Sequence, residues 1–188
     1  MNALEEFCRQ IRSRSKEHKT AISLLHENDV TSQVVAILRQ ELDSMIRVIY
    51  LLTITDKEYR ADLIRASVEG KPWKKKNSQH KITDREMVNI ANQLEGWTES
   101  VYQFGCGFIH LSNFHDYKER DPLAMISPTE KDAILKHMKY YHGGPQNPNP
   151  KFTDLVFYFP RVFEKISDNL ECYVEQLEAD KCLGEDED

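Results

Sequence analysis

Two histidines and a tyrosine stand close together in the ten residues Phe108–Tyr117, as His110, His115 and Tyr117. Histidine is the side chain best placed for proton transfer near neutral pH. Apolar residues recur before them at spacings of three and four, which is typical of one helix face: Val101, Phe104, Phe108 and Leu111. The next position in this series is His115. We therefore predict a helix over 98–116 that aims His115 into a helical core and leaves His110 to one side.

A structural role for both histidines is the alternative, because a buried histidine often has a hydrogen-bond partner and no further function. Metal binding by the pair is disfavoured, since ligands on one helix face need a spacing of three or four residues and these are five apart. A third ligand would have to come from elsewhere, with His137, His142 and Asp116 as candidates. We therefore predict no metal and no cofactor.

A second candidate group lies on the segment 31–54, where Arg39, Asp43 and Arg47 follow one another at spacings of four. Such a ladder of alternating charge can border a core as a set of salt bridges, each stabilising the helix by a few tenths of a kcal/mol. The functional alternative is that an arginine faces His115 across the bundle and grips a phosphate with two donors. Asp43 would then orient an arginine.

A basic loop follows at 71–82 and carries Trp73, Lys74 and Lys75. Loop lysines are commonly solvated and nothing more. Lysines can also contact phosphates, and an aromatic side chain can stack on a base. The loop is therefore a candidate binding element.

The hydrophobic periodicity is helical nearly throughout, and we predict an all-α bundle of six to seven helices. The predicted helices cover 3–25, 31–54, 56–69, 83–94, 98–116, 127–141 and 152–177. We expect one domain over 1–180 with its core at 30–178, to which the helix at 3–26 is appended. An acidic tail follows at 181–188, and we expect its end, 184–188, to be disordered. The polar stretch 12–19 predicts an exposed middle for the first helix. We expect a kink at Pro160 and a close helix crossing at Gly105 and Gly107.

Composition limits the classes of function. The net charge of −6 argues against a broad grip on duplex nucleic acid, although it allows a local basic patch. No apolar run approaches the roughly 20 residues of a membrane span, so we expect no membrane partner. The four cysteines show no metal-binding spacing and are expected to be free thiols in a reducing compartment. The predicted location is the cytoplasm.

The sequence around Arg39, Asp43 and Arg47, together with the stretch from Leu111 to His115, resembles the HEPN superfamily of bacterial helical domains. Many HEPN domains are homodimeric, metal-independent ribonucleases of toxin–antitoxin and phage-defence systems. Active members carry an arginine, four to six residues, and a histidine, which some follow with any residue and a tyrosine. His115 and Tyr117 match the second half of this signature, whereas His110 stands at an arginine position.

The resemblance implies a metal-independent endoribonuclease of bacterial defence or toxin type, acting as a homodimer under the control of an antitoxin or effector protein. His115 would be the acid or base, with His110, Arg39 and Arg47 holding phosphate and Asn113 and Tyr117 lining the cleft. Because the signature arginine is missing, the alternative is a catalytically inactive helical module that binds a nucleotide, an RNA end or a protein partner. A metal-dependent helical enzyme is a third, less favoured hypothesis.

Overall fold

The computed structural model describes residues 2–183 and is all-helical, as predicted. Its α-helices are α1 (Ala3–Glu27), α2 (Thr31–Leu52), α3 (Lys57–Val68), α4 (Asp84–Glu95), α5 (Thr98–Ile109), α6 (Pro128–His142), α7 (Phe152–Val156) and α8 (Phe159–Glu178). Two 3₁₀ helices, η1 (Asn113–Asp116) and η2 (Pro122–Ala124), lie between α5 and α6. Eight α-helices replace the predicted six to seven in the described chain, because the last predicted helix is two.

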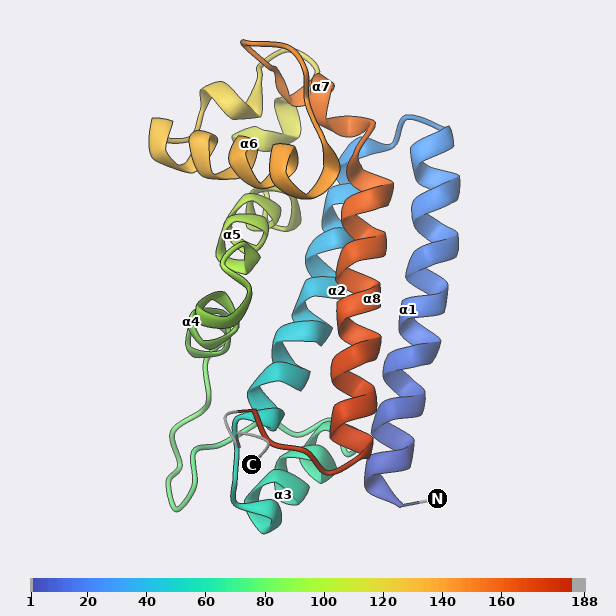
Figure 1. Ribbon diagram of the computed structural model, residues 1–188, viewed down its shortest axis with the longest axis vertical. Coiled ribbons are helices and arrows are strands. Elements are labelled where there is room, and N and C mark those ends of the chain that lie inside the picture. Colours follow the sequence, from blue (N-terminus) through green and yellow to red (C-terminus); the bar gives the residue numbers. More distant parts are fainter. Residues whose placement is uncertain (1, 184–188) are drawn as a thin grey trace.

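Helix α2 is the centre of the bundle, as its sequence pattern predicts. In Figure 1 it runs beside α8 and α1, with α4 and α5 on its other side. Apolar side chains cover most of its circumference, and Leu42, Met45 and Ile46 are wholly buried. Replacing such a leucine with alanine typically costs about 2–5 kcal/mol. The stripe on α2 therefore fixes the positions of the helices around it.

The polar middle of α1 is exposed at most of its positions, as predicted, but not at all of them. His18 is buried and its Nδ1 lies 2.6 Å from an oxygen of Glu41 on α2. Arg12 donates to Glu171 at 2.6 Å and to Glu178 at 2.7 Å, both on α8. These polar residues pack against partners on the neighbouring helices, so α1 lies within the bundle, against α2, α3 and α8.

Helix ends follow the capping signals of the sequence. Thr83 and Glu86 form the predicted capping box of α4, and Ser127 with Glu130 forms a second one at α6, where Pro128 occupies the first turn. Asp56 accepts a hydrogen bond from the Tyr59 amide at the start of α3. Each cap satisfies backbone amides that lack partners inside the helix.

Helix α5 ends at Ile109, seven residues before the predicted end. The chain turns away at His110, and the short helix η1 brings Phe114 back against α5. A Cβ on Gly105 would lie 2.7 Å from the Arg39 Cβ, which confirms the close crossing of α5 over α2 predicted there. Gly107 has a different role, because a Cβ there would lie 2.3 Å from the ring of Phe114.

The last predicted helix is interrupted before its proline. Helix α7 ends at Val156, and α8 begins at Phe159 with Pro160 in its first turn. A proline in the first turn sacrifices no helical hydrogen bond, so Pro160 starts a helix where we predicted a kink within one.

Within the described chain, no helix is both long enough and apolar enough to cross a bilayer. Of the predicted tail, Leu183 is held by a hydrogen bond from its amide to the Leu52 carbonyl at 2.8 Å. The remainder, 184–188, lies outside the described residues.

Candidate functional site

The two histidines of Phe108–Tyr117 lie on the surface, which corrects the prediction that His115 points into the bundle. His110 is the C-cap of α5, and His115 lies in η1; both side chains are exposed. Leu111, between them, is 97% exposed, although its place in the apolar series predicted a core position. Once the helix ends at Ile109, the three-to-four spacing no longer determines which side chains face inward.

The segment is held in place by one hydroxyl and one aromatic ring. Ser112 Oγ donates to the Gly107 carbonyl at 2.6 Å and accepts from the Phe114 amide at 3.1 Å. Phe114 is buried against Phe104 and Phe108, with ring centroids 5.5 and 5.4 Å apart. These contacts fix the backbone that carries both imidazoles.

Of the remaining predicted site residues near Ser112 and Phe114, some pack on aromatic rings and others are exposed to solvent. The ring of His115 meets Phe108 edge-on at 6.5 Å, and Tyr117 packs on Phe108 at 6.1 Å. Asn113 is exposed. The segment thus exposes two imidazoles and one amide to solvent, above the packed rings of Phe104, Phe108 and Phe114.

Arg39 is not beside the histidines. Its side chain is 8% exposed, and its guanidinium carbon lies 3.5 Å from the ring centre of Tyr102, with Nη1 3.6 Å from Asp43. Its buried Nε has no hydrogen-bond partner among the described residues. A stacked, buried guanidinium of this kind joins α2 to α5, and it presents no free fork to a ligand.

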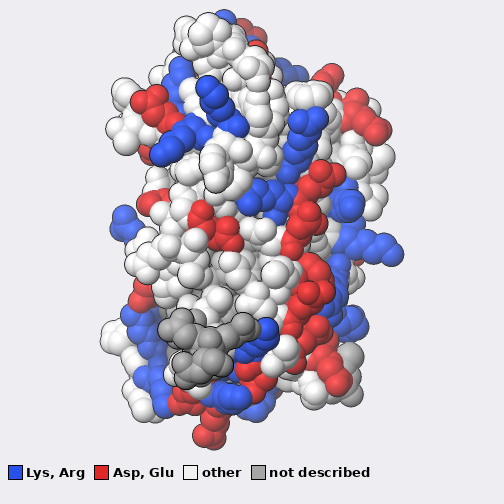
Figure 2. All heavy atoms as spheres, in the orientation of Figure 1, with Lys and Arg blue, Asp and Glu red and all other residues white. Residues whose placement is uncertain are grey.

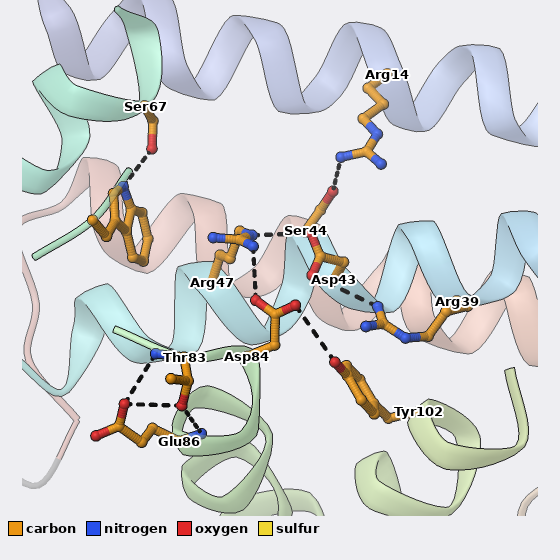
Figure 3. Close-up of polar contacts among 11 residues, drawn as sticks. Arg14, Arg39, Asp43, Ser44, Arg47, Ser67, Thr83, Asp84, Glu86 and Tyr102 are labelled. Carbon is orange, nitrogen blue, oxygen red and sulfur yellow. Dashed lines mark hydrogen bonds and ion pairs between the residues drawn. The ribbon is translucent and has the colours of Figure 1, made fainter. Parts of the chain in front are cut away.

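Arg47 lies two turns along α2 from Arg39 and forms the hub of the contacts in Figure 3. Its Nε donates to Asp43 at 2.9 Å and its Nη2 to Asp84 at 3.1 Å, while Trp73 lies 5.6 Å from its guanidinium. The ladder predicted on α2 is therefore present as a set of ion pairs. Neither arginine contacts His110 or His115 among the described residues, so the structure does not bring the predicted composite site together.

The basic loop is largely neutralised by its surroundings. Lys74 donates to Gln79 at 2.6 Å, Lys75 pairs with Glu86, and Lys76 pairs with Asp56. The Lys75 ammonium and the Thr83 amide lower the pKa of the Glu86 carboxyl to about 2. Lys75 and Lys76 are exposed but ion-paired, whereas Lys74 is exposed and hydrogen-bonded to a neutral amide.

Trp73 is buried in the same loop, and its Nε1 donates to Ser67 at 2.8 Å. It also packs on Tyr50, with ring centroids 5.9 Å apart. Its indole is therefore no exposed surface on which a base could stack.

Sequence reasoning missed three members of these polar clusters. Asp84 and Tyr102 complete the ladder around Arg47 and Arg39, and the Tyr102 hydroxyl donates to Asp84 at 3.5 Å. Glu41 is wholly buried and is contacted by both Ser15 and His18. Glu41 lies two positions before Asp43 on an apolar helix. A charged residue at a position expected in the core could have indicated that Glu41 has a buried polar partner.

The residues considered for a metal site do not converge. Among the described residues, no group of three or more histidine, cysteine, aspartate or glutamate side chains is arranged to hold a metal ion. His137 and His142 lie on α6, and burial lowers the pKa of both imidazoles.

One face of the bundle is strongly acidic. Figure 2 shows an acidic stripe along α8, to which Glu164, Asp168, Glu171, Glu175 and Glu178 contribute. An anionic stripe repels a phosphate backbone. Any nucleic-acid contact therefore belongs on another face of the bundle.

No family model, no curated protein and no solved structure matches this chain.

Proposed function

We propose that this chain acts on RNA as a HEPN-like, metal-independent endoribonuclease, with His110 and His115 as the acid and base. The observation that carries the proposal is the exposure of both imidazoles on a segment fixed by Ser112 and Phe114. Its type, a bacterial defence or toxin protein of the cytoplasm, rests on the sequence resemblance alone.

The chemistry requires a base that takes the proton of the ribose 2′-hydroxyl and an acid that protonates the leaving oxygen. Two imidazoles can divide these roles near neutral pH, because one can be neutral while the other is protonated. In this proposal a histidine at the signature arginine position becomes part of the mechanism. The developing negative charge still needs a cation, and the protonated imidazole supplies it.

A homodimer is part of the proposal. Ile109 and Leu111 flank His110 and are 42% and 97% exposed. Apolar side chains this exposed beside a candidate site are typical of a contact surface. A second copy meeting this tip would place both pairs of histidines in one cleft, and an antitoxin or effector protein could cover the same surface.

The test is RNA cleavage in EDTA by the purified protein. We expect single-residue variants His110→Ala and His115→Ala each to lower the cleavage rate by about 10²–10⁴-fold, the usual contribution of an acid or base. His80→Ala is the matched control, because His80 is also exposed but lies in the basic loop. The proposal fails if the wild type leaves RNA intact, or if His115→Ala cuts RNA as fast as His80→Ala.

A second candidate function is the catalytically inactive module that binds a nucleotide, an RNA end or a protein partner. The observation in its favour is that Arg39 and Arg47 are committed to Asp43 and Asp84 and do not face His115. Intact RNA that nevertheless binds the wild type, and binds His115→Ala more weakly, would favour this candidate.

A further inference from the structure

A pocket of about 300 Å³ opens between α1, α2 and the start of the basic loop. Helix α1 lines it with Arg14 and Gln10 and α2 with Ser44 and Arg47, while Lys71 and Trp73 close it from the loop side. None of its lining residues belongs to Phe108–Tyr117, so this pocket is separate from the proposed RNA-cleaving site. Figure 3 shows four of the lining residues, Arg14, Ser44, Arg47 and Ser67.

The charged lining of this pocket is entirely positive. Arg14, Arg47 and Lys71 contribute cations, and no aspartate or glutamate of the described chain lines it. Lys71 pairs with Glu69 at 2.5 Å, and Arg47 pairs with Asp43 and Asp84. These three acidic residues lie outside the lining of the pocket.

Two of the three cations keep donors free for a ligand. Arg14 is exposed, and its only hydrogen bond in the described chain is a long one, 3.3 Å, to Ser44 Oγ. Arg47 uses Nε and Nη2 for its aspartates and leaves Nη1 without a described partner. Its two ion pairs hold the guanidinium still, so the free nitrogen is already oriented before a ligand arrives.

The remaining walls indicate what else the ligand carries. Phe7, Ile11 and Trp73 give the pocket an apolar side, and the hydroxyls of Ser44 and Ser67 add polar contacts. A volume of about 300 Å³ lies at the lower end of the range for small-molecule pockets. The occupant is therefore small, anionic at one end and apolar at the other.

We propose that this pocket binds a phosphate monoester of mononucleotide size. A carboxylate carries one negative charge, whereas a phosphate monoester carries about 1.5 to 2 near pH 7 and has three strong acceptor oxygens. Three cations match the phosphate better. Arg14 and Arg47 would hold its oxygens, and Lys71 would add charge from the loop. The nucleoside would meet the edges of the largely buried Phe7 and Trp73 without stacking on the indole.

The test is calorimetric titration with adenosine monophosphate, adenosine, inorganic phosphate and benzoate. We expect adenosine monophosphate to bind most tightly, inorganic phosphate more weakly, and adenosine and benzoate at least tenfold more weakly than the monophosphate. Binding should weaken with salt, because the contact is ionic. Absence of binding at millimolar monophosphate, or equal affinity for adenosine or benzoate, overturns the proposal.

Arg14→Gln is the informative variant, because this side chain is exposed and its one described hydrogen bond, to Ser44, is long, so we expect the fold to tolerate the change. We expect it to raise the dissociation constant for adenosine monophosphate at least about tenfold, the loss of one charge-assisted hydrogen bond. Arg9→Gln is its matched control, since Arg9 is also an exposed arginine of α1 and does not line the pocket. Equal affinity in the two variants would overturn the assignment.

Discussion

Replacing His18 with alanine removes the partner of a buried carboxylate. Glu41 is 0% exposed, and the Nδ1 of His18 lies 2.6 Å from one of its carboxylate oxygens. Ser15 donates a hydrogen bond to the other carboxylate oxygen and lies 3.0 Å from Ser167 Oγ on α8. The variant would therefore leave one oxygen of a charged group in the core of the three long helices without a donor.

The expected cost follows from that burial. Removing the hydrogen-bond donor of a buried acceptor costs about 1–3 kcal/mol, and more when the acceptor is a charged group, because the acceptor stays buried without a partner. Ser15 still satisfies one oxygen of Glu41, so we expect about 3 kcal/mol for His18→Ala. In a chain of 188 residues, 1 kcal/mol shifts the melting temperature by about 2–4 °C. The variant should melt about 6–12 °C below the wild type.

Urea unfolding followed by far-ultraviolet circular dichroism measures this difference, because loss of helix reports global unfolding. His80→Ala is the control: its side chain is exposed, and such a surface change should alter the free energy of unfolding by less than about 0.5 kcal/mol. Glu41→Gln completes a double-mutant cycle. Once the buried charge is gone, His18→Ala should cost about 0.5–3 kcal/mol less than it does in the wild type.

Two outcomes would refute the reasoning. A loss below about 1 kcal/mol in His18→Ala would mean that water or a shifted side chain satisfies Glu41 after the change. An undiminished loss in the Glu41→Gln background would mean that the cost comes from the cavity left by the imidazole and not from the buried charge.

Two further predictions concern titration and thiol chemistry. Lys75 holds the pKa of the Glu86 carboxyl at about 2, below its ordinary 4.5. The ionised carboxyl therefore stabilises the fold fully above pH 4.5, and this stabilisation is lost as the pH falls toward 2. Glu86→Gln should flatten the fall in melting temperature between pH 4.5 and pH 2. Burial raises the pKa of the Cys8 thiol to about 11. A thiol reagent at pH 8 should therefore label the exposed Cys172 rapidly and Cys8 only after unfolding. Rapid labelling of Cys8 in the native protein would contradict its burial.

The sequence predicted those elements whose signals are local. The stripe of α2 gave its start at Thr31 and its end within two residues, and the capping boxes at Thr83 and Ser127 located α4 and α6. The end of α5 was missed because Leu111 and His115 continue its apolar spacing. Ser112 and Phe114 decide the outcome there, through a cap and a ring that packs beside Gly107, and such contacts depend on the tertiary fold.

The candidate sites were predictable only in part, for a related reason. Spacing on one helix offered the pairing of Asp43 with Arg39 and Arg47 as one of two alternatives, and the structure shows these pairs. It could not show that Asp84 and Tyr102 would occupy those arginines from α4 and α5. The pocket at Arg14 brings residues of α1, α2 and the loop together, and no spacing within a single segment could reveal it.

The pairing of α1 with α8 also determines the order in which the chain can fold during synthesis. Arg12 meets Glu171 across 159 residues of sequence, and Ser15 meets Ser167 across 152. Contacts this distant cannot form until α8 has left the ribosome, and contacts between distant residues slow folding in general. Until then the apolar side of α1 around Cys8 has no α8 to cover it. A nascent chain stalled before α8 should therefore bind chaperones that recognise apolar helices, and release them once α8 emerges.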